Sequence, residues 1–491
     1  MIRGQMNPEM LARVMFWRLA EPRKPAVRAP YPHPAGRVPL LGDVFRLSPR
    51  SPMAAIQRLG SSLGPIFEIK VFGQRLVVAA DPSVVADLCD ESRFAKYVGP
   101  ELVQLRKVIG SGLVSADVDD PTWRKASELM QPAFSQQAMR AYHSTLADVA
   151  MEFAAYWLTK VDGPAVDVAT ELSRATNEMT GRVTFGQAFG SFERGDPHPF
   201  MAALTAMINQ SERANIMRRV PLSTLLMRRA QEASDKRGSY INGVVDAVIR
   251  ERRANPRDER NDILDVMLGA SGPNNPDQIS DEDIRYQVIG LIFGADATFC
   301  PPSIALYYLS QNPEIFERAR AEVDRVWGPP GASPPSFEQV TKLRYVRRVL
   351  DEALRLWSPV QGFLRVARQD TLLADRYPLE KGEWVVVFIP LLHRDRVWGT
   401  DVDEFDPDRF LPERVKARPA HAFKPYGTGM RSCIGRHLAV HESLLLLGTI
   451  LQRFDTVPQE GYRLEVQESG GVKPAGFELY IRRRHESSSV N

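Results

Sequence analysis

One cysteine in a glycine-rich segment places the strongest constraint on what this chain can fold into. Cys433 lies in the segment 424–436, which contains three glycines and precedes a long apolar stretch typical of a helix. Because glycine tolerates left-handed and tightly turned backbone, this loop can fold closely around one sulfur atom. Arg431 adds a fixed positive charge two residues before the thiol. A haem iron needs this arrangement from its protein ligand: a thiolate in a rigid loop, with backbone N–H groups around it and a cation for a propionate.

The other two cysteines, Cys89 and Cys300, lack such surroundings and are interpreted as small buried apolar residues. Three cysteines far apart in the chain cannot all pair, so we expect no disulfide framework and a reducing compartment such as the cytoplasm. The 63 basic and 60 acidic side chains nearly balance, which argues against nucleic acid as a partner.

The cysteine segment resembles the ligand loop of the cytochrome P450 family, whose pattern is Phe-x-x-Gly-x-Arg-x-Cys-x-Gly. The resembling residues are Tyr426, in the place of the Phe, followed by Gly427, Gly429, Arg431, Cys433 and Gly435. The resemblance implies a mainly helical α+β fold with small sheets, haem b as the cofactor and Cys433 as the ligand of the iron. It is most similar to the haem domains of bacterial self-sufficient fatty-acid hydroxylases, as in residues 89–94 and 131–138.

Further segments resemble the family in the same order along the chain. Glu352 and Arg355 match its Glu-x-x-Arg helix, and Arg409 matches a loop arginine that pairs with that glutamate. We expect these three to form a buried ion network that holds the cysteine loop, because a buried acid needs paired partners to stay charged. The resemblance also implies that haem propionates are bound by Trp123, Arg365 and Lys96, although Arg365 could instead be a surface residue on a strand.

The resemblance begins at about residue 38, so we expect residues 1–37 to form an N-terminal helix and proline-rich segment, and residues 38–491 a single haem-binding domain. Residues 10–20 are apolar but are interrupted by Arg13 and Arg18, and a spanning helix needs about 20 apolar residues. We therefore expect a surface helix and no membrane span. Alternating residues 67–80 predict a hairpin, and residues 384–389 and 477–481 read as strands.

A long helix is predicted to begin at Ser280, which forms a capping box with Asp283. In the family this helix crosses the haem and carries a small residue, a glycine, and an acid followed by a threonine. Gly294 and Asp296 match, and Asp296 is the expected proton-relay acid. Phe293 replaces the small residue, and the remaining catalytic positions are Ala297, in place of the threonine, and Thr298, about 100° further round the helix.

Pro301 and Pro302 follow within the same apolar stretch. Each lacks an N–H donor, so we expect the carbonyls of Ala297 and Thr298 to lose their usual partners. Two interpretations stay open: a plain proline kink, or a widened groove that holds water beside the iron.

The resemblance also implies that the substrate pocket contains Val114, Phe293, Gly294, Val360 and Gln361. Val114 stands where the similar hydroxylases carry a Phe, which implies a more open pocket. Gln74 and Val78 stand where those proteins hold a fatty-acid carboxylate with an Arg and a Tyr. An amide and an isopropyl group cannot replace that charge-assisted clamp, so a simple fatty acid is disfavoured as the substrate.

The sequence as a whole predicts a haem-thiolate monooxygenase that acts with O2 on a small apolar substrate, with electrons from a separate ferredoxin or flavodoxin and its reductase. Because the threonine is missing, an enzyme of radical coupling, nitrogen transfer or peroxide chemistry remains an alternative. An alternative of another class is a haem-binding sensor without turnover.

Overall fold

The structure is a computed structural model that describes residues 29–47, 51–99, 102–103, 106, 109–117, 119–217, 224–256, 262–270, 279–331, 333–468 and 472–484. The expected N-terminal helix over residues 10–20 lies outside these ranges. The division of the chain at residue 37 stays a prediction. Near that position the chain is part of the folded body, since Tyr31 is buried and Arg37 forms ion pairs with Asp43 and Glu68.

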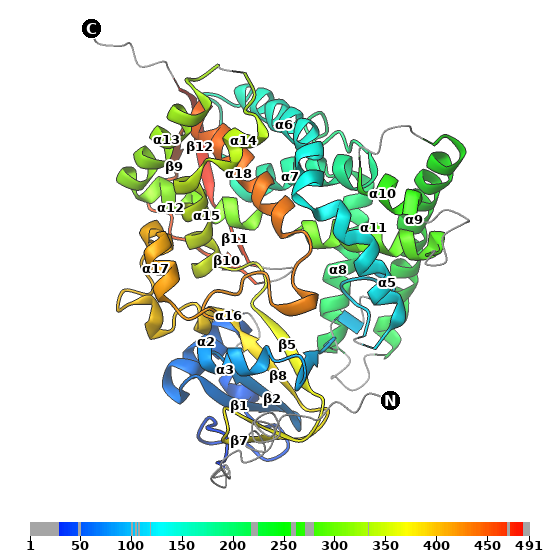
Figure 1. The fold of residues 1–491 in the computed structure, drawn as a ribbon, viewed down its shortest axis with the longest axis vertical. Coiled ribbons are helices and arrows are strands. Elements are labelled where there is room, and N and C mark those ends of the chain that lie inside the picture. The colour runs from blue at the N-terminus through cyan, green and yellow to red at the C-terminus, as the bar shows by residue number, and fades with distance from the viewer. Residues whose placement is uncertain are drawn as a thin grey trace, which may run out of the picture.

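Helices make up most of the molecule and gather on one side of it (Figure 1). The long α-helices are α2 (Pro52–Leu63), α5 (Pro121–Met130), α6 (Gln136–Leu158), α7 (Val168–Phe185), α8 (Pro199–Met217), α9 (Thr224–Ala254), α11 (Asp281–Ala295), α12 (Cys300–Gln311), α13 (Pro313–Trp327), α15 (Arg344–Leu356) and α18 (Arg436–Arg453). Shorter ones are α3 (Pro82–Leu88), α10 (Ile263–Ala270), α14 (Phe337–Thr341), α16 (Ile389–Leu392) and α17 (Pro412–Ala417). Single 3-10 turns are η1 (Val44–Arg46), η2 (Gln131–Phe134), η3 (Arg396–Trp398), η4 (Pro407–Phe410) and η5 (Gly429–Arg431).

The strands form small sheets beside this helical body, as the sequence predicted. They are β1 (Ile66–Val71), β2 (Gln74–Ala79), β3 (Phe94–Lys96), β4 (Val166–Asp167), β5 (Gly362–Ala367), β6 (Thr371–Leu373), β7 (Tyr377–Leu379), β8 (Trp384–Phe388), β9 (Phe454–Pro458), β10 (Val466–Gln467), β11 (Lys473–Pro474) and β12 (Glu478–Arg483). The largest sheet has the order β1-β2-β8-β5-β3, and the others are β4-β12-β9, β6-β7 and β10-β11.

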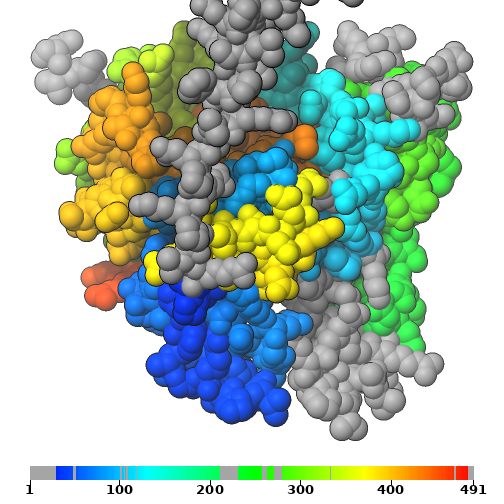
Figure 2. Space-filling view, turned by 60° about the horizontal axis from the view of Figure 1, so that its bottom comes forward, coloured from blue at the N-terminus to red at the C-terminus, as the bar shows by residue number. Residues whose placement is uncertain are grey.

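The largest sheet joins two segments that are far apart in the chain, residues 66–96 and 362–388. The predicted hairpin is confirmed as β1 and β2, and its two-residue turn, Phe72 and Gly73, has φ angles of 48° and 78°. Positive φ at both turn residues is typical of a type I′ turn, whose twist matches that of the strands. β2 pairs in parallel with β8, and β5 pairs with β3. Figure 2 shows the result on the surface: residues near the start of the chain (blue) lie next to residues that are about 300 positions later (yellow).

The core helices are α11, α12 and α18. The capping box at Ser280 is present, and α11 begins directly after it. Nearly every residue of α18 after Leu438 is buried, which is expected of a helix that other helices surround on all sides. Among the described residues one helical stretch, Asp281–Gln311, is long and apolar enough to cross a membrane. About 61% of its most apolar part is buried within the protein, so its apolar character is explained by the core.

Candidate haem site

The loop that carries Cys433 is tightly folded, and its shape depends on glycine. Gly427 and Gly429 have φ angles of 69° and 70°. This left-handed conformation is energetically unfavourable for any residue that has a Cβ atom. A Cβ on Gly429 would also lie 2.1 Å from a carboxylate oxygen of Glu91, which accepts a hydrogen bond from the N–H of Met430. The N–H of Cys433 donates to the carbonyl of Tyr426 over 2.9 Å. The backbone on both sides of the thiol is therefore held in place.

The thiol of Cys433 lies at the start of α18, where backbone donors point towards it. Burial raises the pKa of this thiol, while hydrogen bonds from the N–H groups of Gly435 and Arg436 and the Arg436 charge oppose that rise. The side chain nevertheless keeps accessible surface, and the next residue, Ile434, lines a small recess together with Gly290 of α11. A helix N-terminus favours negative charge, so this position suits a thiolate bound to a cation.

An open face of α11 belongs to the same recess. Gly290 and Gly294 lie one helical turn apart, and a Cβ built on either would meet no atom within 4 Å. The residues of this face therefore leave room for a flat group beside the helix.

Three cations with little accessible surface lie close together: Arg365 is buried, and Lys96 and Arg431 are half-buried. Lys96 and Arg365 are direct cross-strand partners in the β3–β5 pair, although like charges opposite each other destabilise a sheet. Burial lowers the pKa of Lys96 to about 7 and that of Arg431 to about 10, and it also lowers the pKa of Arg365. In the described part of the chain, none of the three forms an ion pair within 4.0 Å. Such a cluster requires anionic groups from outside the chain.

Each of these cations is oriented by protein carbonyls. Lys96 donates to the carbonyl of Val114 over 3.1 Å, and Arg365 donates to those of Leu88 and Phe94. Arg431 donates to the carbonyl of Ala116 over 2.7 Å, and its guanidinium lies 4.2 Å from the ring centre of Trp123. Arg365 is only 2% exposed, so it is not a surface residue of its strand. The residues predicted to bind propionates therefore lie close together.

A buried ion network lies behind the cysteine loop. Glu352 and Arg355 are completely buried and share two hydrogen bonds of 2.7 and 2.8 Å. The Nε of Arg409 lies 3.3 Å from the same carboxylate without hydrogen-bond geometry, and its other nitrogens donate to the carbonyls of Trp398 and Asp401. The predicted network is present in the structure, and it connects α15 with the loop that contains η4.

The predicted long helix is interrupted between α11 and α12. Residues 296–299 form turns, with Asp296, Ala297 and Thr298 at the break. The expectation that the Ala297 carbonyl lacks a partner is wrong, because the N–H of Cys300 donates to it over 3.3 Å. This tighter turn is possible because Pro301 and Pro302 lie in the first turn of α12, where helical N–H groups are not needed. The Thr298 carbonyl still faces Pro302, which has no N–H to donate.

Asp296 is the acid of this break. Burial raises the pKa of its carboxyl, and the ammonium group of Lys473 opposes the rise. Lys473 is the first residue of β11. The N–H of the preceding residue, Val472, donates a hydrogen bond to the carbonyl of Pro359. Sequence reasoning missed Lys473, because only the tertiary fold brings the end of the chain to this helix.

The arrangement fits haem b: a cysteine at a helix N-terminus near an open helix face, and three cations that form no ion pair among the described residues and could bind two propionates. A family model of cytochrome P450 matches residues 32–479. The chain belongs to the cytochrome P450 family.

Similar proteins agree with this assignment. The haem domain of cytochrome P450DA, a solved structure, shares 35% identity with a TM-score of 0.87, over 94% of this chain and 99% of that one. The bifunctional cytochrome P450/NADPH–P450 reductase of Bacillus cereus is 35% identical over 91% of this chain. The bifunctional cytochrome P450/NADPH–P450 reductase 2 of Bacillus subtilis is 36% identical over 89% of this chain. The chain spans 42% and 41% of the lengths of those two relatives.

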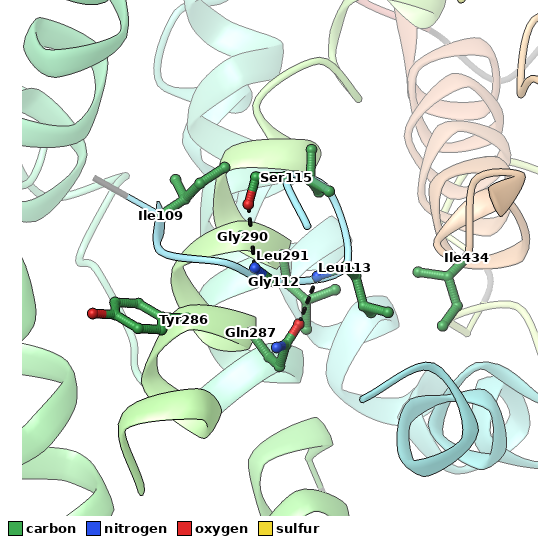
Figure 3. A pocket seen from close by; sticks show the side chains of 10 residues that line it. Ile109, Gly112, Leu113, Ser115, Tyr286, Gln287, Gly290, Leu291 and Ile434 are labelled. Carbon is green, nitrogen blue, oxygen red and sulfur yellow. Dashed lines mark hydrogen bonds between the residues drawn. The ribbon is translucent and has the colours of Figure 1, made fainter. Parts of the chain in front are cut away.

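A small cavity with a volume of about 40 Å³ lies between α11 and the loop of residues 109–115 in this P450 fold (Figure 3). It is lined by Ile109, Gly112, Leu113, Val114, Ser115, Tyr286, Gln287, Gly290, Leu291 and Ile434. Of the predicted pocket residues, only Val114 lines it. Gln287, which accepts a hydrogen bond from the N–H of Leu113 over 3.0 Å, was not found from the sequence.

The other predicted pocket residues do not line this cavity. Gly294 is exposed on the open face of α11, next to the half-buried Phe293. Val360 is 57% exposed, and Gln361 donates its amide to the carbonyl of Ser358. Their contact with a substrate stays a prediction.

Proposed function

We propose that this chain is the haem domain of a monooxygenase that inserts one atom of O2 into a small apolar organic substrate. The observation that carries the proposal is the position of Cys433 at the N-terminus of α18, next to Ile434, which lines the same small cavity as Gly290 of α11. Bound haem would supply the redox chemistry that activates O2. Cys433 would hold the iron, and Lys96, Arg365 and Arg431 would hold the propionates.

Asp296 is the proposed proton donor, at the break between α11 and α12. Its carboxyl takes up a proton more readily than an exposed one, because burial raises its pKa. It lies at the break directly after α11, so we propose that it holds a proton near the Gly294 end of this helix. Ala297 carries no hydroxyl, and we propose that a water bound to the Thr298 carbonyl takes the place of the missing side chain.

The proposed substrate is a specialised metabolite and not a simple fatty acid. Support comes from the two positions of the missing carboxylate clamp: Gln74 at the start of β2 carries no charge, and Val78 is completely buried in a cluster with Phe67 and Phe388. Val360, which is predicted to face the substrate, adds exposed apolar surface.

The electron donor is also a proposal. The Bacillus relatives combine a cytochrome P450 and an NADPH–P450 reductase in one bifunctional protein. They give no support to the expectation of a separate ferredoxin or flavodoxin, and we propose electron transfer from a reductase of the NADPH–P450 type.

The iron ligand is tested by replacing Cys433 with His. We expect the reduced carbon-monoxide complex of the parent to absorb at the long wavelength of thiolate-bound haem, and the variant to absorb at the wavelength of imidazole-bound haem. The charged thiolate donates more electron density than a neutral imidazole, which is the reason for the shift. A parent spectrum that is already of the imidazole type, in freshly prepared protein, would contradict the assignment and with it the proposed function.

The water relay is tested with two proline variants. We expect Pro302→Ala to lower the product formed per electron several-fold, because the new N–H donates to the Thr298 carbonyl and displaces the water. Pro301→Ala is the matched control and should change the yield little, since the Ala297 carbonyl already accepts from Cys300. The measurement counts product, consumed NADPH and released peroxide, with a substrate chosen by its shift of the haem absorption band. Equal yields for the parent and Pro302→Ala would exclude the relay.

A further inference from the structure

His393 follows α16 and lies between the ion network and the cysteine loop. It is completely buried. Its Nδ1 lies 3.1 Å from the carbonyl oxygen of Arg355, and its Nε2 lies 3.0 Å from the backbone nitrogen of Lys424. Its own carbonyl accepts a hydrogen bond of 2.9 Å from the guanidinium of Arg355. One histidine therefore contacts both α15 and the first residue of the loop segment 424–436.

These partners determine the tautomer of the ring. The backbone N–H of Lys424 is a donor, so Nε2 must be unprotonated, and the Arg355 carbonyl is an acceptor, so Nδ1 must carry the hydrogen. The neutral form is favoured, because burial lowers the pKa of His393 to about 3. Phe423 and Trp398 pack around the ring of His393, and their ring centroids lie 5.1 and 6.1 Å from its own.

A continuous series of contacts runs from the ion network through this ring to the thiol. The carboxylate of Glu352 accepts from Arg355, and Arg355 and His393 share two hydrogen bonds. The carbonyl of Lys424 then accepts from the N–H of Gly427, and the carbonyl of Tyr426 accepts from the N–H of Cys433. In the described residues around the loop, His393 is the side chain that receives the Lys424 N–H.

We propose that His393 is a positioning residue: its Nε2 fixes the Lys424 end of the cysteine loop and so keeps Cys433 where the thiolate can bind the iron. Without this acceptor the Lys424 N–H would be unpaired in a partly buried place, and the loop would move to find another partner. The inference uses the ligand role of Cys433 that the proposed function assigns. It adds that the Glu352–Arg355 pair acts on the loop through one neutral imidazole.

Two amide variants separate the two hydrogen bonds of the ring. In His393→Gln the side-chain oxygen reaches the position of Nε2 and can accept from Lys424, whereas in His393→Asn the shorter amide reaches only the Nδ1 position and can serve only Arg355. We expect His393→Gln to keep most of the thiolate-type carbon-monoxide spectrum. We expect His393→Asn and His393→Phe to lose several-fold more of it to the form without thiolate, although Phe preserves the packing.

A second readout needs no haem spectrum: exchange of the Lys424 amide hydrogen should be at least ten-fold faster in His393→Asn than in His393→Gln. His441→Gln is the matched control, since His441 is also a buried histidine, but its Nε2 pairs with Nδ1 of His143. This variant should leave the spectrum and the Lys424 exchange unchanged.

Equal spectra and equal Lys424 exchange for His393→Gln and His393→Asn would overturn the proposal, because the ring would then only fill space. The tautomer gives a test in the unaltered protein: nitrogen NMR should find the hydrogen on Nδ1 of His393, and a hydrogen on Nε2 would also overturn it. Failure of the ligand assignment itself would look different, since the parent protein would then lack the thiolate-type spectrum.

Discussion

Glu352→Gln should lower the free energy of unfolding by about 3–5 kcal/mol, the usual cost of removing one partner from a buried ion pair. Burial raises the pKa of Glu352, and the hydrogen bonds and charge of Arg355 oppose this and keep the pair together. With a neutral amide at this position, the buried guanidinium of Arg355 and that of Arg409 would lose their shared counter-charge. Urea unfolding of the parent and the variant, followed by circular dichroism, gives the difference.

The matched control is Glu338→Gln, which removes an acid from an ion pair on the surface. Glu338 pairs with Arg140, and the two side chains are 49% and 57% exposed. Exposed pairs contribute about 0–1 kcal/mol, so this variant should unfold almost like the parent. If the free energy of unfolding falls by the same amount in both variants, the buried Glu352 network contributes no more to stability than the surface ion pair.

Glu442→Gln should stabilise the protein at pH 8. Glu442 is 1% exposed on α18, and its Oε1 has no hydrogen-bond partner in the described residues. Burial raises the pKa of its carboxyl to about 8, whereas an unfolded chain has a glutamate pKa of about 4.3. The folded state therefore keeps a proton that the unfolded state has released. Stability from this group is fully present below about pH 4.3 and is lost as the pH rises to about 8.

The glutamine variant does not titrate, so it should escape this loss. At about 1.4 kcal/mol for each pKa unit, the variant should gain stability relative to the parent by up to roughly 5 kcal/mol at pH 8. The measurement is urea unfolding of both proteins at several values between pH 5 and pH 8.5. Glu413→Gln, at an exposed position, should show no such trend. A difference between Glu442→Gln and the parent that does not change with pH would contradict the assigned pKa.

Much of the site could be predicted because its residues are close together in the sequence. The cysteine loop needs glycines at 427 and 429 for a positive φ, and both stand directly before the thiol. The capping box at Ser280 and the hairpin of residues 67–80 likewise depend on neighbours, so local patterns were enough to predict them, whereas the two residues of the hairpin turn came from the structure.

The helix break shows where local reasoning stopped. Two prolines were expected to leave two carbonyls without partners, but a tighter turn lets Cys300 serve the Ala297 carbonyl. Propensity predicts which donors are missing, whereas the packing around α11 and α12 decides how the backbone adjusts.

The sequence by itself determined the family and the acid–arginine network, and it predicted Cys433 as the iron ligand, because each depends on a short spacing that only a few chemistries require. Only the tertiary structure decided what surrounds them. It placed Lys96 opposite Arg365, brought Lys473 towards Asp296, and inserted His393 between Arg355 and Lys424. Lys96 and Arg365 are 269 positions apart in the sequence, and Asp296 and Lys473 are 177 positions apart. Burial and charge act through space, so no pattern along the chain could reveal them.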